Sequence, residues 1–220
     1  MSKPRLTYFS SRGRGELIRV LLAEAGVDYE ELAVGPFHPR ERTPGFLEVL
    51  ATGKLAYDAL PLWEEADGFV IVQSDAIVRH IARTRGLYGA GDREATRCDV
   101  VLEGVKDART EIMRVIQVDP SGRAEARADL VSEGIPRWLG YLERILAANR
   151  GGEGFFVGDS VTCADLAVWL LLETVTDNDL IASLAALPRL AAFKGRIQGR
   201  ERVARYVASP TRYPAQLLPK

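Results

Sequence analysis

Residues 4–34 read PRLTYFSSRGRGELIRVLLAEAGVDYEELAV. Residues 4–9 have the pattern of a short strand, and residues 16–25 repeat apolar side chains at helical spacing until Gly26 ends the helix. Residues 29–34 supply a second strand. The stretch therefore predicts a β-α-β unit whose crossover is right-handed and whose two strands are parallel.

The sequence after this unit predicts a strand hairpin followed by a helix. Residues 35–53 are rich in proline, glycine and charge, which predicts a long loop with one helical turn. Residues 60–63 and 69–72 are apolar, and Asp67-Gly68 between them is a hairpin signal, so these two strands should be antiparallel. A helical pattern follows at residues 74–85. The order β-α-β, loop, β-β-α is that of an α/β thioredoxin-like fold with a mixed sheet.

Beyond Gly86 the pattern becomes entirely helical. The expected helices cover residues 92–118, 123–149, 163–176 and 188–199. Thr162-Cys-Ala-Asp165 has the residue types of a capping box, in which the threonine and aspartate side chains satisfy each other's backbone amides at a helix start. We expect two domains, a thioredoxin-like domain at residues 1–85 and an all-α domain at residues 91–220.

Composition excludes several classes of function. The chain has 220 residues, of which 47% are hydrophobic, and 29 basic against 30 acidic residues leave a formal net charge of -1. This balance gives no electrostatic reason to expect nucleic acid or an anionic membrane as a partner. No apolar run approaches the roughly 20 residues of a membrane span, and the N-terminal residues show no signal-peptide pattern. The expected location is cytoplasmic.

The chain contains few histidines and cysteines that could take part in catalysis or bind a metal. The only histidines are His38 and His80, so neither a histidine triad nor a metal site is expected. Cys98 and Cys163 are too few for a disulfide scaffold, and we expect them to be buried free thiols.

Polar residues instead gather where the predicted elements end. Tyr8 closes the first strand, and Ser10–Gly15 precede the first helix. Leu60-Pro61 and Gln73-Ser74 stand at the ends of other elements. Because helix N-termini bind carboxylates, Gln73-Ser74 is a possible anion site, although Ser74 could simply cap its helix.

These residues resemble the Tyr-type classes (alpha, mu, pi and sigma) of cytosolic glutathione transferase. Tyr8-Phe-Ser-Ser-Arg-Gly-Arg14-Gly-Glu16 is similar to the opening motif of the family, and Gln73-Ser74-Asp-Ala-Ile-Val-Arg-His-Ile81 to a second motif. Leu60-Pro61 stands where the family has a cis-proline, and Phe156-Val-Gly-Asp-Ser-Val-Thr-Cys-Ala-Asp165 resembles its C-terminal folding motif. The likeness covers nearly the whole chain.

The resemblance implies a reaction and a site. Tyr8 would donate a hydrogen bond to the glutathione sulfur, favouring the thiolate that attacks small hydrophobic electrophiles. A free thiol with a pKa near 8.5 is only a few per cent ionised at pH 7, whereas tyrosine, with an ordinary pKa near 10, keeps its proton to donate. The other implied glutathione ligands are Arg14, the backbone of Leu60 before a cis-Pro61, Gln73, Ser74 and, from the partner in a homodimer, Asp107.

The loop before Pro61 departs from the family pattern. Phe46 stands where a tryptophan is usual, and Leu50 where a lysine usually binds the glycine carboxylate of glutathione, so Lys54 could substitute. The second-substrate pocket would be lined by Ser11, Met113, Arg114 and Gln117, which name no particular electrophile.

Three alternatives stay open. Glutathione could serve isomerisation or peroxide reduction instead of conjugation, or the protein could bind glutathione or other ligands without catalysis, which the changes at Phe46 and Leu50 favour slightly. Ser10 or Ser11 could replace Tyr8 as the activating hydroxyl.

Overall fold

The computed structural model describes residues 2–38 and 40–219, which form two compact units. The first unit contains the described residues up to Arg85 together with the segment Glu201–Gln216. The second contains Gly86–Arg200 and the described residues from Leu217 onward. The division expected from the sequence, 1–85 and 91–220, did not separate Glu201–Gln216 from the helical part. This segment groups with the first unit because helix α9 (Glu201–Val207) packs on helix α1 (Glu16–Ala25).

The first unit is built on a mixed sheet. Its described strands are β1 (Arg5–Tyr8), β2 (Glu30–Ala33), β3 (Leu62–Glu64) and β4 (Val70–Val72), in the order β2-β1-β3-β4. Strand β1 pairs parallel to β2 and antiparallel to β3, and β3 pairs antiparallel to β4. The hairpin turns at Asp67-Gly68, where Gly68 adopts a φ of 93° and donates its amide to the Glu65 carbonyl. The thioredoxin-like arrangement is confirmed.

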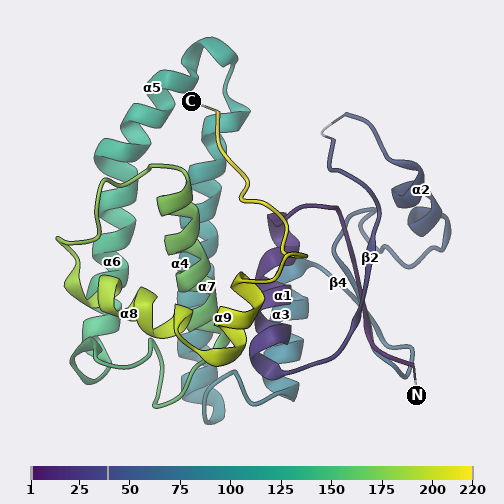
Figure 1. Cartoon of the computed structure of the whole chain (residues 1–220), viewed down its shortest axis with the longest axis horizontal. Helices are drawn as coiled ribbons and strands as arrows, with labels where there is room; N and C mark the ends of the chain where they lie inside the picture. The colour runs from purple at the N-terminus through teal and green to yellow at the C-terminus, as the bar shows by residue number, and fades with distance from the viewer. Residues whose placement is uncertain (1, 39, 220) are drawn as a thin grey trace. The chain divides into compact units, whose positions relative to one another are not determined.

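Helices cover this sheet. Helix α1 ends at Gly26, whose φ of 66° suits a left-handed cap, and α3 (Ser74–Thr84) contacts α1. Figure 1 shows α1 and α3 together on one side of the sheet and α2 (Pro44–Ala51) beyond the other. Helix α2 is longer than the single turn expected from the sequence. A 3₁₀ turn, Gly13–Gly15, leads into α1.

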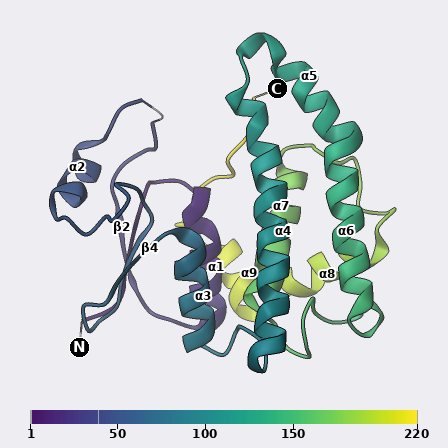
Figure 2. The ribbon, with the colours of Figure 1, turned by 180° about the vertical axis from the view of Figure 1, so that it is seen from behind.

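All the regular secondary structure among the described residues of the second unit is helical. The helices are α4 (Gly91–Gln117), α5 (Arg123–Asp129), α6 (Ile135–Ala148), α7 (Cys163–Asp177) and α8 (Pro188–Gln198), with short 3₁₀ turns at Pro120–Gly122 and Arg150–Gly152. Helix α7 is apolar and buried along most of its length and packs on α4 and α8 (Figure 2). The helix expected at residues 123–149 is present as one continuous helical run, but a π-helical stretch, Leu130–Gly134, divides it into α5 and α6. Pro136, just beyond this stretch, has no amide to donate.

The capping box at the start of α7 is confirmed. The Asp165 side chain is fully buried and accepts the amide of Thr162 at 2.7 Å, the hydroxyl of Thr162 at 2.7 Å and the amide of Phe156 at 2.7 Å. Both cysteines, Cys98 and Cys163, are buried free thiols, as expected.

Candidate functional site

Tyr8 ends β1 with its side chain buried and its hydroxyl held by the backbone. The residue is 7% exposed, and the amide of Arg14 donates to the hydroxyl oxygen at 2.8 Å. A hydroxyl that accepts this hydrogen bond still has its own proton to donate. The geometry therefore leaves Tyr8 able to donate to a second acceptor, such as a sulfur anion.

Two glycines allow the loop to approach the Tyr8 ring. A Cβ on Gly13 would lie 2.5 Å from the Tyr8 hydroxyl, and a Cβ on Gly15 would lie 2.7 Å from a ring carbon. Gly13 also has a φ of 39°, in the left-handed region that favours glycine. The spacing Arg12-Gly-Arg14-Gly thus lets the loop close tightly over the tyrosine.

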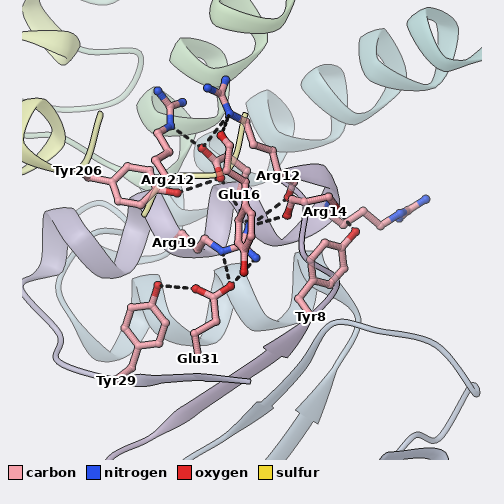
Figure 3. A network of polar contacts seen from close by, with 11 residues as sticks. Tyr8, Arg12, Arg14, Glu16, Arg19, Tyr29, Glu31, Tyr206 and Arg212 are labelled. Atoms are coloured by element: carbon pink, nitrogen blue, oxygen red, sulfur yellow. Dashed lines mark hydrogen bonds and ion pairs between the residues drawn. The ribbon is translucent and has the colours of Figure 1, made fainter. Parts of the chain in front are cut away.

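Arg14 contributes its backbone to this contact and leaves its side chain exposed. Figure 3 shows the Arg14 side chain extending away from the Tyr8 ring. Ser10 and Ser11 lie in the bend after β1, where the Ser10 amide donates to the Gly35 carbonyl at 2.8 Å and the Ser11 amide to the Phe9 carbonyl at 2.7 Å.

An apolar cluster surrounds Tyr8 within the first unit. It includes Phe46 and Leu60, together with Val34, Val49, Leu55 and Leu62. Phe46 is 6% exposed, so a buried ring without a hydrogen-bond donor stands at the position where the resemblance implies a tryptophan. The Leu60-Pro61 peptide bond is cis, as the resemblance implies.

Gln73 and Ser74 form the start of α3. Gln73 occupies the N-cap position with φ 72° and ψ 115°, a conformation that a non-glycine residue adopts at a cost, and its side chain makes no capping hydrogen bond. Ser74 is the first helical residue and is 8% exposed, so it does not occupy the N-cap position that the alternative interpretation gave it. The first amides of α3 lack partners within the helix and suit a carboxylate.

Lys54 is engaged elsewhere in the first unit. Its ammonium group lies 2.6 Å from a carboxylate oxygen of Glu64 on β3. Leu50 packs against the apolar cluster. Sequence reasoning did not single out Arg42, whose guanidinium carbon lies 5.5 Å from the centre of the Phe46 ring and whose side chain is exposed.

The remaining predicted residues belong to the second unit. Asp107, Arg114 and Gln117 are exposed on α4, and Met113 is half-buried there. The structure brings Tyr8, Arg14, Phe46, Leu60, Pro61, Gln73 and Ser74 into the first unit, and their binding roles stay predictions.

The histidines have local partners. His80 Nε2 lies 3.0 Å from Glu65, and His38 Nδ1 accepts the amide of Glu41 at 2.9 Å. Within residues 2–38 and 40–219, no group of three or more histidine, cysteine, aspartate or glutamate side chains could hold a metal ion. No helix in the same residues is long and apolar enough to cross a membrane.

The fold and this strand-end tyrosine define a class: a thioredoxin-like domain with an added helical domain. Residues 4–83 match the family model "Glutathione S-transferase, N-terminal domain", and residues 106–210 match "Glutathione S-transferase, C-terminal domain". Human glutathione S-transferase P is 32% identical over 207 residues, covering 93% of this chain and 91% of the relative. Rat glutathione S-transferase alpha-1 is 34% identical over 207 residues, covering 93% and 88%.

A solved structure agrees with these sequence relatives. The Pi-class glutathione S-transferase of Onchocerca volvulus superposes with a TM-score of 0.80 at 27% identity, covering 93% of this chain and 92% of that one. The chain therefore belongs to the glutathione S-transferase family, a family of transferases that use glutathione as a co-substrate.

Proposed function

We propose that this protein transfers the thiolate of glutathione to small hydrophobic electrophiles and that Tyr8 stabilises the thiolate. The observation that carries the proposal is the Tyr8 hydroxyl, which accepts the Arg14 amide at 2.8 Å and keeps a proton to donate. Family membership supports glutathione as the thiol.

The energy that this step requires is modest. Lowering the pKa of the glutathione thiol by about two units reverses the ratio of thiol to thiolate at neutral pH and requires about 2.7 kcal/mol of preferential stabilisation of the anion. One charge-assisted hydrogen bond from Tyr8, with positive charge nearby, is of this size. Arg14, whose side chain is exposed beside the same loop, is the residue that we propose for that charge.

The other ligands follow the ends of the elements. We propose that the first amides of α3, with Gln73 and Ser74, hold the γ-glutamyl end of glutathione, and that the backbone of Leu60 pairs with its cysteinyl part. The strained backbone of Gln73 supports the first assignment, because such strain gathers at functional sites. Asp107 of a second subunit would reach the amine in a cytoplasmic homodimer, and Ser11, Met113, Arg114 and Gln117 would line the electrophile pocket.

The glycine carboxylate of glutathione has two candidate cationic ligands, and neither is positioned by the structure for this role alone. Lys54 would have to leave Glu64 before it could bind the glycine carboxylate, and Arg42 beside Phe46 is a second cation for that role. Calorimetric titration of glutathione into the Lys54→Ala and Arg42→Ala variants separates these two candidates. Only removal of the residue that binds the glycine carboxylate should weaken glutathione binding.

Replacement of Tyr8 tests the proposal. The Tyr8→Phe variant should lose about 25-fold in conjugation rate at pH 7, since a rise of the thiol pKa from about 6.5 to about 8.5 lowers the thiolate fraction from about three quarters to about 3%. Tyr141→Phe removes a hydroxyl from the second unit and serves as the matched control, which should keep full activity. Full activity in Tyr8→Phe, with loss in Ser10→Ala or Ser11→Ala, would instead identify a serine as the activating hydroxyl.

A second candidate function is glutathione binding without catalysis. Phe46 in place of a donor-bearing ring and Lys54 in an ion pair with Glu64 both favour it. Retention on immobilised glutathione without turnover of a panel of electrophiles, peroxides and isomerisable substrates would support this function, and turnover of one class would name the reaction.

A further inference from the structure

A buried carboxylate at the start of α1 joins two parts of the first unit that are far apart in the chain. Glu16 is 1% exposed. One of its carboxylate oxygens accepts Arg212 Nε at 2.8 Å, and the other accepts the Tyr206 hydroxyl at 2.9 Å (Figure 3). Arg19 Nη1 lies 3.5 Å and Arg12 Nε 3.9 Å from the same carboxylate. The partners thus come both from α1 with its preceding loop and from the C-terminal segment Glu201–Gln216.

The side chains around Glu16 are also buried, so its charge depends on the groups that contact it. The Arg212 side chain is 6% exposed and that of Arg19 is 2% exposed. Burial, and then the charge of Glu16, raise the pKa of Tyr206, so Tyr206 keeps its proton and donates it to Glu16. A buried charge left without its partners is costly, which makes this carboxylate dependent on the C-terminal segment.

The C-terminal segment Glu201–Gln216 is also anchored at other points. Arg202 Nη1 donates to the Glu24 carbonyl at 2.9 Å, and a Cβ on Gly26 would lie 2.9 Å from the Arg202 guanidinium carbon. Arg12 Nε donates to the Tyr213 carbonyl at 2.8 Å. The segment therefore follows α1 from its C-terminal end to the loop that precedes it.

Arg19 connects Glu16 to the loop that holds Tyr8. Its Nη1 donates to the carbonyls of Ser11 at 2.9 Å and Arg12 at 3.3 Å, and its Nη2 lies 2.6 Å from Glu31. The Arg19 guanidinium lies 5.7 Å from the centre of the Tyr8 ring. Burial opposes the charge of Arg19, but the hydrogen bond and charge of Glu31 outweigh it and raise the pKa of Arg19.

We propose that the C-terminal segment Glu201–Gln216 is a positioning element for the thiol chemistry, acting through Glu16 and Arg19 on the loop that contacts the Tyr8 hydroxyl. The inference rests on the proposed function of Tyr8. Arg212 and Tyr206 do not touch the Tyr8 hydroxyl; they hold Glu16, Glu16 holds Arg19, and Arg19 holds the carbonyls that precede Arg14 in the loop. Small displacements of such a support weaken a hydrogen bond that is needed for reaction.

The test compares two arginines of the same segment in the full chain. Arg212→Ala removes a buried partner of Glu16, whereas Arg205→Ala removes an exposed arginine whose pair with Glu201 is 73% and 83% exposed. For both variants and the wild type, the ultraviolet absorbance of the bound glutathione thiolate is titrated with pH, and kcat and KM are measured across the same range.

We expect Arg212→Ala to raise the pKa of the bound glutathione thiol by about 0.5 to 1 unit, which lowers the thiolate fraction about three- to tenfold at pH values below that pKa. The rate should recover as the pH rises above the shifted pKa, with KM for the electrophile unchanged, and Arg205→Ala should behave as wild type. A variant that is merely less stable, with the wild-type thiol pKa and a loss equal at every pH, would overturn the inference.

A milder variant keeps the test open if Arg212→Ala does not fold. Tyr206→Phe removes only the hydroxyl that donates to Glu16 and should shift the thiol pKa in the same direction by a smaller amount; an unchanged pKa would overturn the inference. The outcomes also separate the inference from the proposed function. If the wild type forms no bound thiolate, or Tyr8→Phe leaves the thiol pKa unchanged, the proposed function fails and the inference fails with it. If Tyr8→Phe raises the thiol pKa but Arg212→Ala and Tyr206→Phe leave it unchanged, the inference fails while the proposed function stands.

Discussion

The two units each bury a carboxylate, and the partners of these carboxylates differ in kind. Glu16 in the first unit faces the guanidinium groups of Arg12, Arg19 and Arg212. Asp165 in the second unit accepts neutral donors, the amides of Phe156 and Thr162 and the Thr162 hydroxyl. The first arrangement ties distant segments together by charge, and the second closes one helix start by local hydrogen bonds.

This difference predicts that removing the Glu16 carboxylate lowers the free energy of unfolding more than removing the Asp165 carboxylate. Glu16→Ala removes the carboxylate that the buried Arg212 contacts at 2.8 Å, and breaking a buried ion pair from one side costs about 3–5 kcal/mol. Urea unfolding followed by circular dichroism measures the free energy of unfolding. A loss below about 1 kcal/mol would mean that the Glu16–Arg212 pair contributes little to stability, and the contrast with Asp165 would disappear.

Asp165→Ala should cost somewhat less, about 2–3 kcal/mol, because the hydrogen bonds that it removes have neutral donors. Thr162→Val is a matched control that removes only one hydroxyl of the box and should cost about 1 kcal/mol. Equal losses in the two variants would show that the box does not act through the Asp165 carboxylate.

The contrast between the local contacts of Asp165 and the distant contacts of Glu16 also explains which structural features can be predicted from the sequence. The capping box joins Thr162 to a residue three positions later, so a local pattern reveals it. The β-α-β unit, the hairpin at Asp67-Gly68 and the tyrosine at the end of β1 are local in the same sense and were predicted from spacing and resemblance.

The C-terminal partners of Glu16, Tyr206 and Arg212, lie 190 and 196 residues away in the chain, and no spacing rule links them to it. Nothing in the local sequence marks Arg202, Tyr206 and Arg212 as partners of α1, and only the fold places them against it. The π-helical stretch before Pro136 was missed for a related reason, because the apolar period continues across it. Tertiary contacts decide these features, whereas local propensity decides the others.

A pH dependence should distinguish the second carboxylate. Burial raises the pKa of Asp165 from its ordinary 3.8 to about 6, against the opposing effect of its hydrogen bonds. A carboxyl with a raised pKa holds a proton in the folded state that the unfolded state has lost, so stability falls as the pH rises through this range. Between about pH 4.5 and about pH 6 the loss should be about 1.5 kcal/mol relative to Asp165→Asn, which cannot titrate. Unfolding titrations of both proteins that run parallel would contradict this.

The smallest effect on stability should come from a glutamate–arginine ion pair that resembles Glu16–Arg212 in chemistry but is exposed. Glu201 and Arg205, one helical turn apart in α9, lie 2.7 Å apart with both side chains largely in solvent. A double-mutant cycle with Glu201→Ala and Arg205→Ala should give a coupling energy of about 0.3–0.5 kcal/mol that added salt removes. The corresponding cycle for Glu16 and Arg212 should give a larger coupling that salt leaves nearly unchanged, because burial excludes the screening ions. If both couplings fell equally with salt, the Glu16 cluster would be accessible to solvent and could not hold Arg19 in place.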